Sequence, residues 1–134
     1  MKVVSNPLIY LFNLHRGDDE PPSAITRLGW RYHHVGIPTS IPRPDERYLP
    51  QYKMYVAGFE RNPFGVERMR FEEDCPLPAL IQNVAHVAFE VDDLDAALEG
   101  LEVICPPGEP SEGVRAAMIL YDGAPIELIT FDRK

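Results

Sequence analysis

The feature of this sequence that most restricts its fold is an internal repeat. Residues 34–37 (HVGI) match residues 86–89 (HVAF), and residues 65–71 (GVERMRF) match residues 125–131 (PIELITF). Each half therefore opens with a histidine and closes with a glutamate. A repeat of this kind indicates two copies of one supersecondary unit that bury their apolar faces against each other.

We assign the repeat to one domain, residues 31–134, with module one at residues 31–78 and module two at residues 79–134. The chain has 134 residues, 45% of them hydrophobic, which suits one compact domain. Residues 1–30 have no counterpart in the repeat and combine an apolar stretch with an acidic segment that contains prolines. We expect them to form an N-terminal extension or arm.

In module one, residues 32–37, 52–60 and 66–73 have the composition of strands. Four prolines within residues 38–50 predict a loop there, because proline in a helix interior costs about 3 kcal/mol. The helix of module one is therefore expected to be reduced or absent.

Module two contains a stretch with helical spacing after its first strand. Asp92 or Asp93 can cap this helix, and Gly100 lies where a helix commonly ends. The apolar positions at helical spacing are Leu94, Ala97, Leu98 and Leu101. Strands are predicted at residues 85–91, 102–105, 114–121 and 125–131, with a loop at residues 106–113.

The paired histidines and glutamates predict a metal site. Imidazole nitrogen and carboxylate oxygen together suit first-row divalent ions, and His34, Glu67, His86 and Glu127 supply two of each. Four protein ligands leave coordination positions open for a substrate. A structural zinc site would instead use several cysteines, whereas the two cysteines of this chain do not form a CxxC pair.

Strand alternation predicts what lies next to these ligands. Side chains two residues apart on a strand share a face, so each glutamate should face a cavity together with apolar neighbours. The two predicted sets are Glu67, Met69 and Phe71, and Glu127, Ile129 and Phe131. We expect a cavity with ligands at one end and apolar walls beyond.

The segments HHVGI, GVERMRF, HVAFEVDDLDAAL and APIELITF resemble the vicinal oxygen chelate superfamily. This group contains glyoxalase I, methylmalonyl-CoA epimerase, extradiol dioxygenases, fosfomycin-resistance proteins and bleomycin-resistance proteins. The resemblance, which extends from about residue 31 to the C-terminus, implies an α+β fold of tandem βαβββ modules that form an incomplete barrel around a metal. It places His34 and Glu67 from module one, and His86 and Glu127 from module two, as the metal ligands. It also implies a homodimer.

A glutamate at the end of module one resembles the four-ligand arrangement of glyoxalase I and the epimerases. This implies a metal-dependent lyase or isomerase that moves a proton on a small oxygen-chelating metabolite, with Glu127 or Glu67 as general base. The ion could be Zn, Ni, Mn, Co or Fe. Two alternatives stay open: an Fe(II) ring-cleaving dioxygenase, and a non-catalytic drug-binding protein of the bleomycin-resistance type.

Several neighbouring residues have alternative roles. His33 competes with His34, but only His34 aligns with His86, so we expect His33 in a solvent-exposed or loop position. Glu90 shares the face of His86 by parity, and is either a further base or hydrogen-bond partner of the site or a solvated carboxylate. Arg68 and Arg70 should point away from the cavity. The aromatic candidates for its lining are Tyr52, Tyr55, Phe59 and Phe64.

The acidic composition argues against polyanionic partners. The net charge is -8 and the sequence pI is about 4.9, so a nucleic acid or an anionic membrane surface would be repelled. No stretch approaches the roughly 20 apolar residues of a membrane-spanning helix. Sparse cysteine usage favours a reduced, cytoplasmic location.

Overall fold

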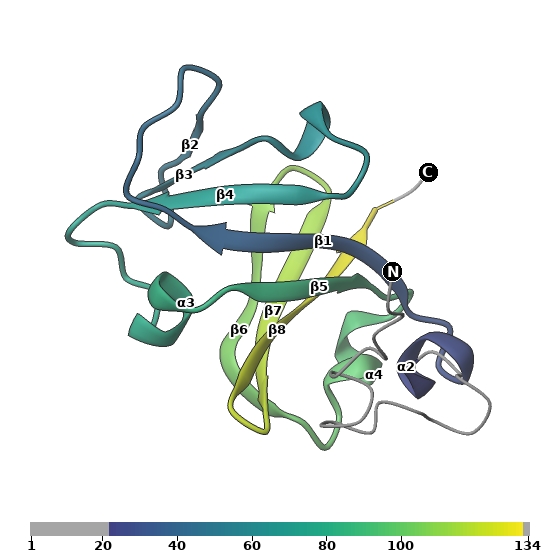
Figure 1. Ribbon diagram of the computed structural model, residues 1–134. Coiled ribbons are helices and arrows are strands. Elements are labelled where there is room, and N and C mark those ends of the chain that lie inside the picture. The colour runs from purple at the N-terminus through teal and green to yellow at the C-terminus, as the bar shows by residue number, and fades with distance from the viewer. Residues whose placement is uncertain (1–21, 133–134) are drawn as a thin grey trace, which may run out of the picture. The chain divides into compact units, whose positions relative to one another are not determined.

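The computed structural model describes residues 22–132 (Figure 1). The chain divides into two compact units, residues 1–30 and residues 31–134. Within the described part of the first unit there is one short helix, α2 (Ser23–Thr26), which follows Pro22. Most of the predicted arm falls outside the described residues.

The second unit is built on one eight-stranded mixed sheet in the order β2-β3-β4-β1-β5-β8-β7-β6. The sheet curls into an incomplete barrel (Figure 1). Its strands are β1 (Arg31–Pro38), β2 (Arg47–Leu49), β3 (Met54–Ala57), β4 (Val66–Phe71), β5 (His86–Glu90), β6 (Glu102–Ser111), β7 (Val114–Tyr121) and β8 (Ala124–Phe131).

The two halves of the sheet have the same connectivity. In the first half β1 pairs parallel with β4, and in the second β5 pairs parallel with β8. The two opening strands, β1 and β5, pair antiparallel at the centre. Residues 39–46 contain no helix, whereas α4 (Leu94–Leu98) joins β5 to β6. The predicted α+β fold with a missing first helix is confirmed.

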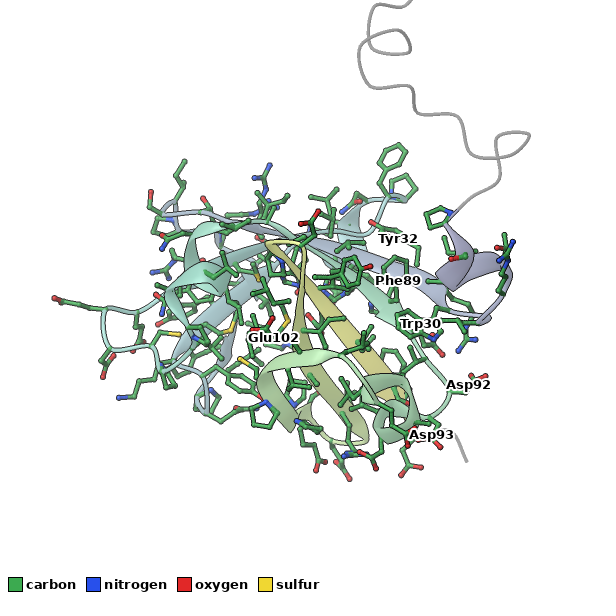
Figure 2. All side chains as sticks on the ribbon, turned by 90° about the horizontal axis from the view of Figure 1, so that it is seen from below. Trp30, Tyr32, Phe89, Asp92, Asp93 and Glu102 are labelled. Atoms are coloured by element: carbon green, nitrogen blue, oxygen red, sulfur yellow. The ribbon has the colours of Figure 1, made fainter. Side chains whose placement is uncertain are left out.

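Helix α4 forms where the sequence provides a cap and an apolar face. The Asp93 side chain accepts a hydrogen bond from the Ala96 backbone N–H at 3.1 Å, and Figure 2 places Asp92 and Asp93 at this end of the helix. Gly100 ends the segment with a φ of +75°, a conformation that costs glycine little. Leu94 is fully buried where α4 contacts β7 and β8.

Strand β6 corrects a prediction, because it continues through residues 106–111, most of the segment 106–113 where a loop was expected. Pro106 and Pro110 discouraged a strand assignment. Since β6 is an edge strand, its outer N–H groups need no partner, and proline is tolerated there. Its pairing with β7 shifts register three times, which accommodates the irregular sequence.

Three smaller elements also differ from the predictions. Strand β2 lies inside the predicted 38–50 loop, and α3 (Ala79–Asn83) lies in the link between modules. The predicted strand 52–60 ends early, because Gly58 adopts a φ of +99° and a 3-10 turn, η1 (Phe59–Arg61), follows it. Among the described residues, no helix is both long and apolar enough to cross a membrane.

Candidate metal centre

The ligand residues predicted by the repeat lie on the central strands of the sheet. In one row across the sheet, His34 on β1 pairs with Ala88 on β5, which pairs with Glu127 on β8. In the adjacent row, Glu67 on β4 pairs with Gly36 on β1, which pairs with His86 on β5. All four predicted side chains therefore project from one face of the sheet.

Small residues separate the ligands in each row. Ala88, which is fully buried, lies between His34 and Glu127, and Gly36 lies between Glu67 and His86. A Cβ atom added to Gly36 would come within 2.3 Å of His86 Cε1. The position of the His86 ring therefore depends on the missing side chain at residue 36. Each small residue follows its histidine by two positions, a signal present in both copies of the repeat.

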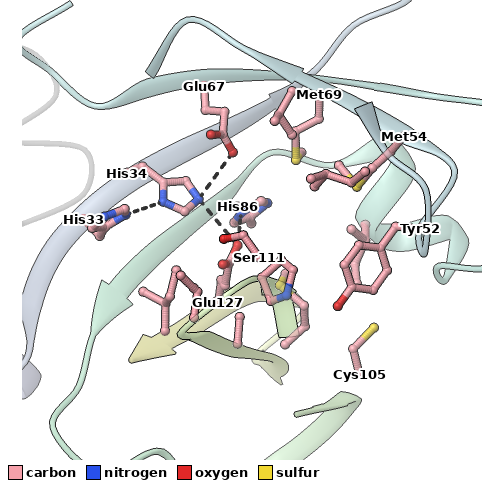
Figure 3. A pocket seen from close by; sticks show the side chains of 18 of the residues that line it. His33, His34, Tyr52, Met54, Glu67, Met69, His86, Cys105, Ser111 and Glu127 are labelled. Atoms are coloured by element: carbon pink, nitrogen blue, oxygen red, sulfur yellow. Dashed lines mark hydrogen bonds and ion pairs between the residues drawn. The ribbon is translucent and has the colours of Figure 1, made fainter. Parts of the chain in front are cut away.

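Three of the predicted ligands converge on one point (Figure 3). His34, His86 and Glu127 each offer a ligand atom, and these atoms all lie within 4.8 Å of one another. Glu127 Oε1 is 2.9 Å from His86 Nε2 and 3.4 Å from His34 Nε2. Both histidines are buried, with 5% and 4% exposure. These three side chains could bind a metal ion.

The spacing suits an ion of ordinary size. Ligand atoms about 2.1 Å from a shared ion are about 3.0 Å apart at a right angle and about 3.4 Å apart at the tetrahedral angle. The distances from Glu127 Oε1 to His86 Nε2 and to His34 Nε2, 2.9 and 3.4 Å, are close to these values.

Glu67 lies close to His34, His86 and Glu127, but it is not one of the three residues whose ligand atoms lie within 4.8 Å of one another. Its Oε1 is 3.9 Å from His34 Nε2, and its side chain is 21% exposed. The structure thus brings all four predicted residues to one site, with three in ligand contact range and Glu67 beside them (Figure 3).

Burial and neighbouring charges give the two carboxyl groups different pKa values. Burial opposes ionisation of Glu127, but hydrogen bonds with His34 and His86 outweigh it and lower the pKa of Glu127 to about 2. Burial raises the pKa of Glu67 above its ordinary value. Burial also opposes protonation of His34, yet the hydrogen bond and charge of Glu127 raise the pKa of His34. Glu127 is thus suited to hold a cation, and Glu67 to accept a proton.

A cavity of about 300 Å³ extends from the four candidate ligands. Figure 3 places Met69, Met54, Tyr52 and Cys105 along it, beyond the histidines and glutamates. Its walls are largely apolar, and Arg47, Glu60 and Ser111 add polar groups. Apolar lining residues include Leu49, Met54, Val56, Met69, Leu77, Ile81, Ile129 and Phe131.

His33 was expected in a solvent-exposed or loop position and is instead part of the cavity lining. Between Tyr32 and His34, β1 carries one residue more than β5, because Tyr32 pairs with Phe89 and His34 with Ala88. His33 is the extra residue of this β-bulge, which interrupts the alternation of side chains. Its Nδ1 is 2.7 Å from His34 Nδ1. Strand parity missed His33, and only the adjacent pair of histidines hinted at it.

Other candidate residues divide between the cavity and the outer surface. Glu90 does not line the cavity, and it accepts a hydrogen bond from Arg31 at 3.1 Å. Arg70 is bound to Glu46 by two hydrogen bonds of 2.8 Å, and Arg68 is exposed and not part of the lining. Of the four aromatic candidates, Tyr52 and Phe59 line the cavity, while Tyr55 and Phe64 do not.

Comparisons with known proteins find a related fold. No family model matches the sequence, and no curated protein matches it. Hypothetical protein BH1468 from Bacillus halodurans C-125 superposes with a TM-score of 0.61 at 16% identity, covering 78% of this chain and 96% of that chain. Methylmalonyl-CoA epimerase from Mycobacterium tuberculosis superposes with a TM-score of 0.55 at 18% identity, covering 75% of this chain and 87% of that chain. At these identities the likeness concerns the fold, which is glyoxalase-like.

Proposed function

We propose that this chain is a metal-dependent isomerase or lyase of the vicinal oxygen chelate superfamily, which moves a proton on a small oxygen-chelating metabolite. The observation that carries the proposal is the convergence of His34, His86 and Glu127, with Glu67 beside them, at one end of an apolar cavity. The fold that it shares with methylmalonyl-CoA epimerase supports the same reading.

His34, His86 and Glu127 would hold a divalent ion, chosen from Zn, Ni, Mn, Co and Fe. When bound, such an ion supplies Lewis-acid polarisation of a substrate carbonyl, which makes the adjacent C–H more acidic. The apolar walls would exclude water from the reacting end of the substrate.

The two carboxylates would divide the work. Glu127, whose low pKa keeps it charged, serves as the anionic ligand. Glu67 has a raised pKa and lies outside the tightest group, so it is the better general base. Glu67 would take the proton from the substrate carbon onto a carboxylate oxygen and return it to give the isomerised product.

Elemental analysis of the purified protein and of the variant His86→Ala tests the metal site. We expect close to one divalent ion per chain in the wild type and a large loss in the variant. An equally low metal content in both proteins would contradict the proposal, and retained binding of an apolar small molecule would then favour a non-catalytic binding protein.

The division between the carboxylates is tested with Glu67→Gln and Glu127→Gln. We expect Glu67→Gln to keep metal affinity within a few fold and to slow deuterium incorporation from D₂O into α-hydroxycarbonyl or acyl-thioester probes by 100-fold or more. Glu127→Gln should weaken metal affinity at least about 10-fold, because it removes the anionic ligand. Normal exchange in Glu67→Gln would exclude Glu67 as the base.

One observation favours a second function. The tightest group holds two histidines and one carboxylate, the ligand set of many non-haem Fe(II) oxygenases. An Fe(II)-loaded protein that consumes oxygen with catechol probes, and shows no proton exchange, would establish the ring-cleaving dioxygenase instead.

A further inference from the structure

We propose that His33 is a positioning residue of the metal centre: it accepts a hydrogen bond from His34 Nδ1 and so fixes the tautomer in which His34 Nε2 is free to bind the ion. The inference rests on the proposed metal site. It assigns a role to a residue that the repeat does not contain, because the corresponding position before His86 is Ala85.

The bulge in β1 makes this contact possible. In a regular strand, His33 and His34 would point to opposite faces of the sheet. The extra residue between Tyr32 and His34 breaks that alternation, and both imidazoles line the same cavity. Their rings meet edge to face, with centroids 5.0 Å apart and an interplanar angle of 78°.

The contact between His33 and His34 restricts which ring nitrogens can carry a hydrogen. A hydrogen bond between two imidazole nitrogens contains one hydrogen, so one nitrogen donates and the other accepts. His34 Nε2 is the nitrogen that faces Glu127, at 3.4 Å from its Oε1. If Nε2 binds the ion, neutral His34 carries its hydrogen on Nδ1 and donates it, and His33 Nδ1 accepts at 2.7 Å. Partners of this kind orient a ligand histidine and fix its tautomer.

Aromatic contacts hold the accepting ring in place. The His33 ring stacks on Phe59 with centroids 4.9 Å apart and an interplanar angle of 16°. It also lies 5.1 Å from the Phe131 ring. His33 is thus held by one aromatic residue from each module, Phe59 in η1 and Phe131 in β8, and its Nδ1 faces His34 Nδ1.

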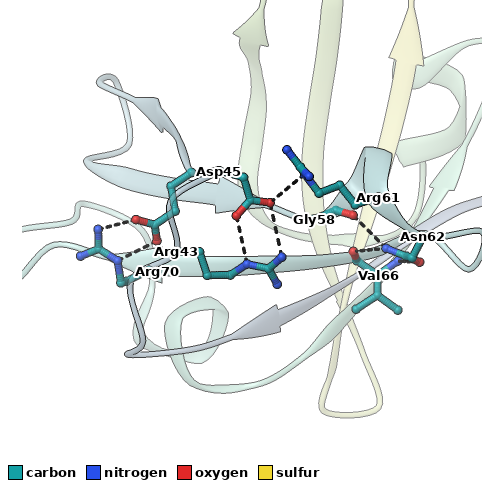
Figure 4. Close-up of polar contacts among 8 residues, drawn as sticks. Arg43, Asp45, Gly58, Arg61, Asn62, Val66 and Arg70 are labelled. Atoms are coloured by element: carbon teal, nitrogen blue, oxygen red, sulfur yellow. Dashed lines mark hydrogen bonds and ion pairs between the residues drawn. The ribbon is translucent and has the colours of Figure 1, made fainter.

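The turn that carries Phe59 is itself anchored (Figure 4). The Asn62 side chain donates to the carbonyl groups of Gly58 and Val66 at 2.8 and 3.0 Å. Its Oδ1 accepts from the backbone N–H groups of Phe64 and Val66. Asp45 joins the same region by accepting a hydrogen bond from Arg43 and pairing with Arg61. This network holds the turn in the conformation that stacks Phe59 against the His33 ring.

Two substitutions separate the hydrogen-bond role from a packing role. His33→Phe keeps a ring to stack on Phe59 but removes the acceptor. His33→Asn removes the ring but places an amide oxygen where Nδ1 lies. If His33 acts as an acceptor, we expect His33→Phe to weaken Zn²⁺ and Co²⁺ affinity by about 10- to 100-fold, and His33→Asn to stay within a few fold of the wild type.

The measurements are competition titrations with a chromophoric chelator, and the visible absorption spectrum of the Co²⁺ protein. We expect the Co²⁺ spectrum of His33→Phe to change and that of His33→Asn to match the wild type. ¹⁵N NMR of the Zn²⁺ protein should show the hydrogen of His34 on Nδ1. Thermal unfolding of the metal-free variants shows that each is folded at the titration temperature.

The outcomes distinguish this inference from the proposed function. If the wild type binds neither ion, the metal site itself fails. If the wild type binds, and His33→Phe binds as tightly as His33→Asn or more tightly, the acceptor role of His33 is overturned while the metal site stands. A hydrogen found on His34 Nε2 in the Zn²⁺ protein would overturn it as well.

Discussion

Gly36 lies opposite His86 across β1 and β5, where any side chain would collide with the imidazole. We predict that Gly36→Ala displaces the His86 ring and weakens divalent-metal affinity at least about 10-fold, a loss typical of a misplaced ligand. Isothermal titration of the metal-free protein measures it. Gly123→Ala controls for a general loss of stability, because its φ of +80° strains alanine in the β7–β8 turn while its Cβ would meet no atom. Unchanged affinity in Gly36→Ala would show that the ring can shift without loss.

The raised pKa of His34 predicts competition between protons and metal. A group with a raised pKa holds its proton to higher pH, and this proton must leave before Nε2 binds an ion. Metal affinity should therefore increase as pH rises through neutrality and level off above the pKa of His34. In Glu67→Gln, which removes one negative charge beside His34, the rise should occur at lower pH. Affinity that does not change between about pH 6 and 8 would contradict this prediction.

At the residue scale, the repeat made most of the candidate site predictable. The alignment of the two copies identifies one histidine and one glutamate in each. Antiparallel pairing of β1 with β5 brings the two copies together. His33 was not predictable in the same way. Its position depends on a β-bulge. The segment from Tyr32 to His34 contains no glycine, the residue that often marks a bulge in a sequence.

Helix α4 is the element whose core contact can be tested directly. Leu94 is 1% exposed and lies where α4 contacts β7 and β8. We predict that Leu94→Ala lowers the free energy of unfolding by about 2–5 kcal/mol, and that Leu94→Met lowers it by less than about 1.5 kcal/mol. Chemical denaturation measures both changes. Metal affinity should stay within about twofold in both variants, because α4 supplies no ligand; a larger loss would link the helix to the site.

At the element scale, the sequence predicted strands well where apolar alternation is regular. Strand β7 has the predicted bounds of residues 114–121, and β8 begins one residue earlier than predicted. The errors at β6, β2 and α3 concern segments that contain or adjoin prolines, and the error at β3 follows from the left-handed φ of Gly58. Proline rules apply to paired interior positions, whereas β2 and β6 are the two edges of the sheet. Whether a strand lies at the edge of a sheet depends on the whole fold, so it cannot be predicted from the local sequence.

For the whole molecule we predict a homodimer. Among residues 22–132, strands β2 and β6 form the two edges of the sheet, and exposed strand edges favour association. Sedimentation equilibrium at micromolar concentrations should give about twice the mass of 15.2 kDa. A monomeric mass across the concentration range would contradict this prediction and would limit the site to residues of one chain.

The arrangement of two modules in an incomplete barrel was predictable, because the repeat indicates two copies of one unit and the superfamily that it resembles implies such a barrel. How tightly the sheet curls and how large the cavity is were not predictable. They depend on how eight twisted strands pack, and on side chains from distant segments, such as Tyr52 and Cys105, that meet along one cavity.

The division of ligands between the halves has a consequence for how such a site can arise. Each copy of the repeat carries one histidine and one glutamate. These two side chains alone are too few to surround a metal ion. A single copy could complete the coordination sphere only by associating with a second copy of itself. Once fused in one chain, the two copies are free to diverge, as His33 beside His34 and Ala85 beside His86 already differ. A bound ion would then cross-link the two halves of the repeat, and its loss would uncouple them.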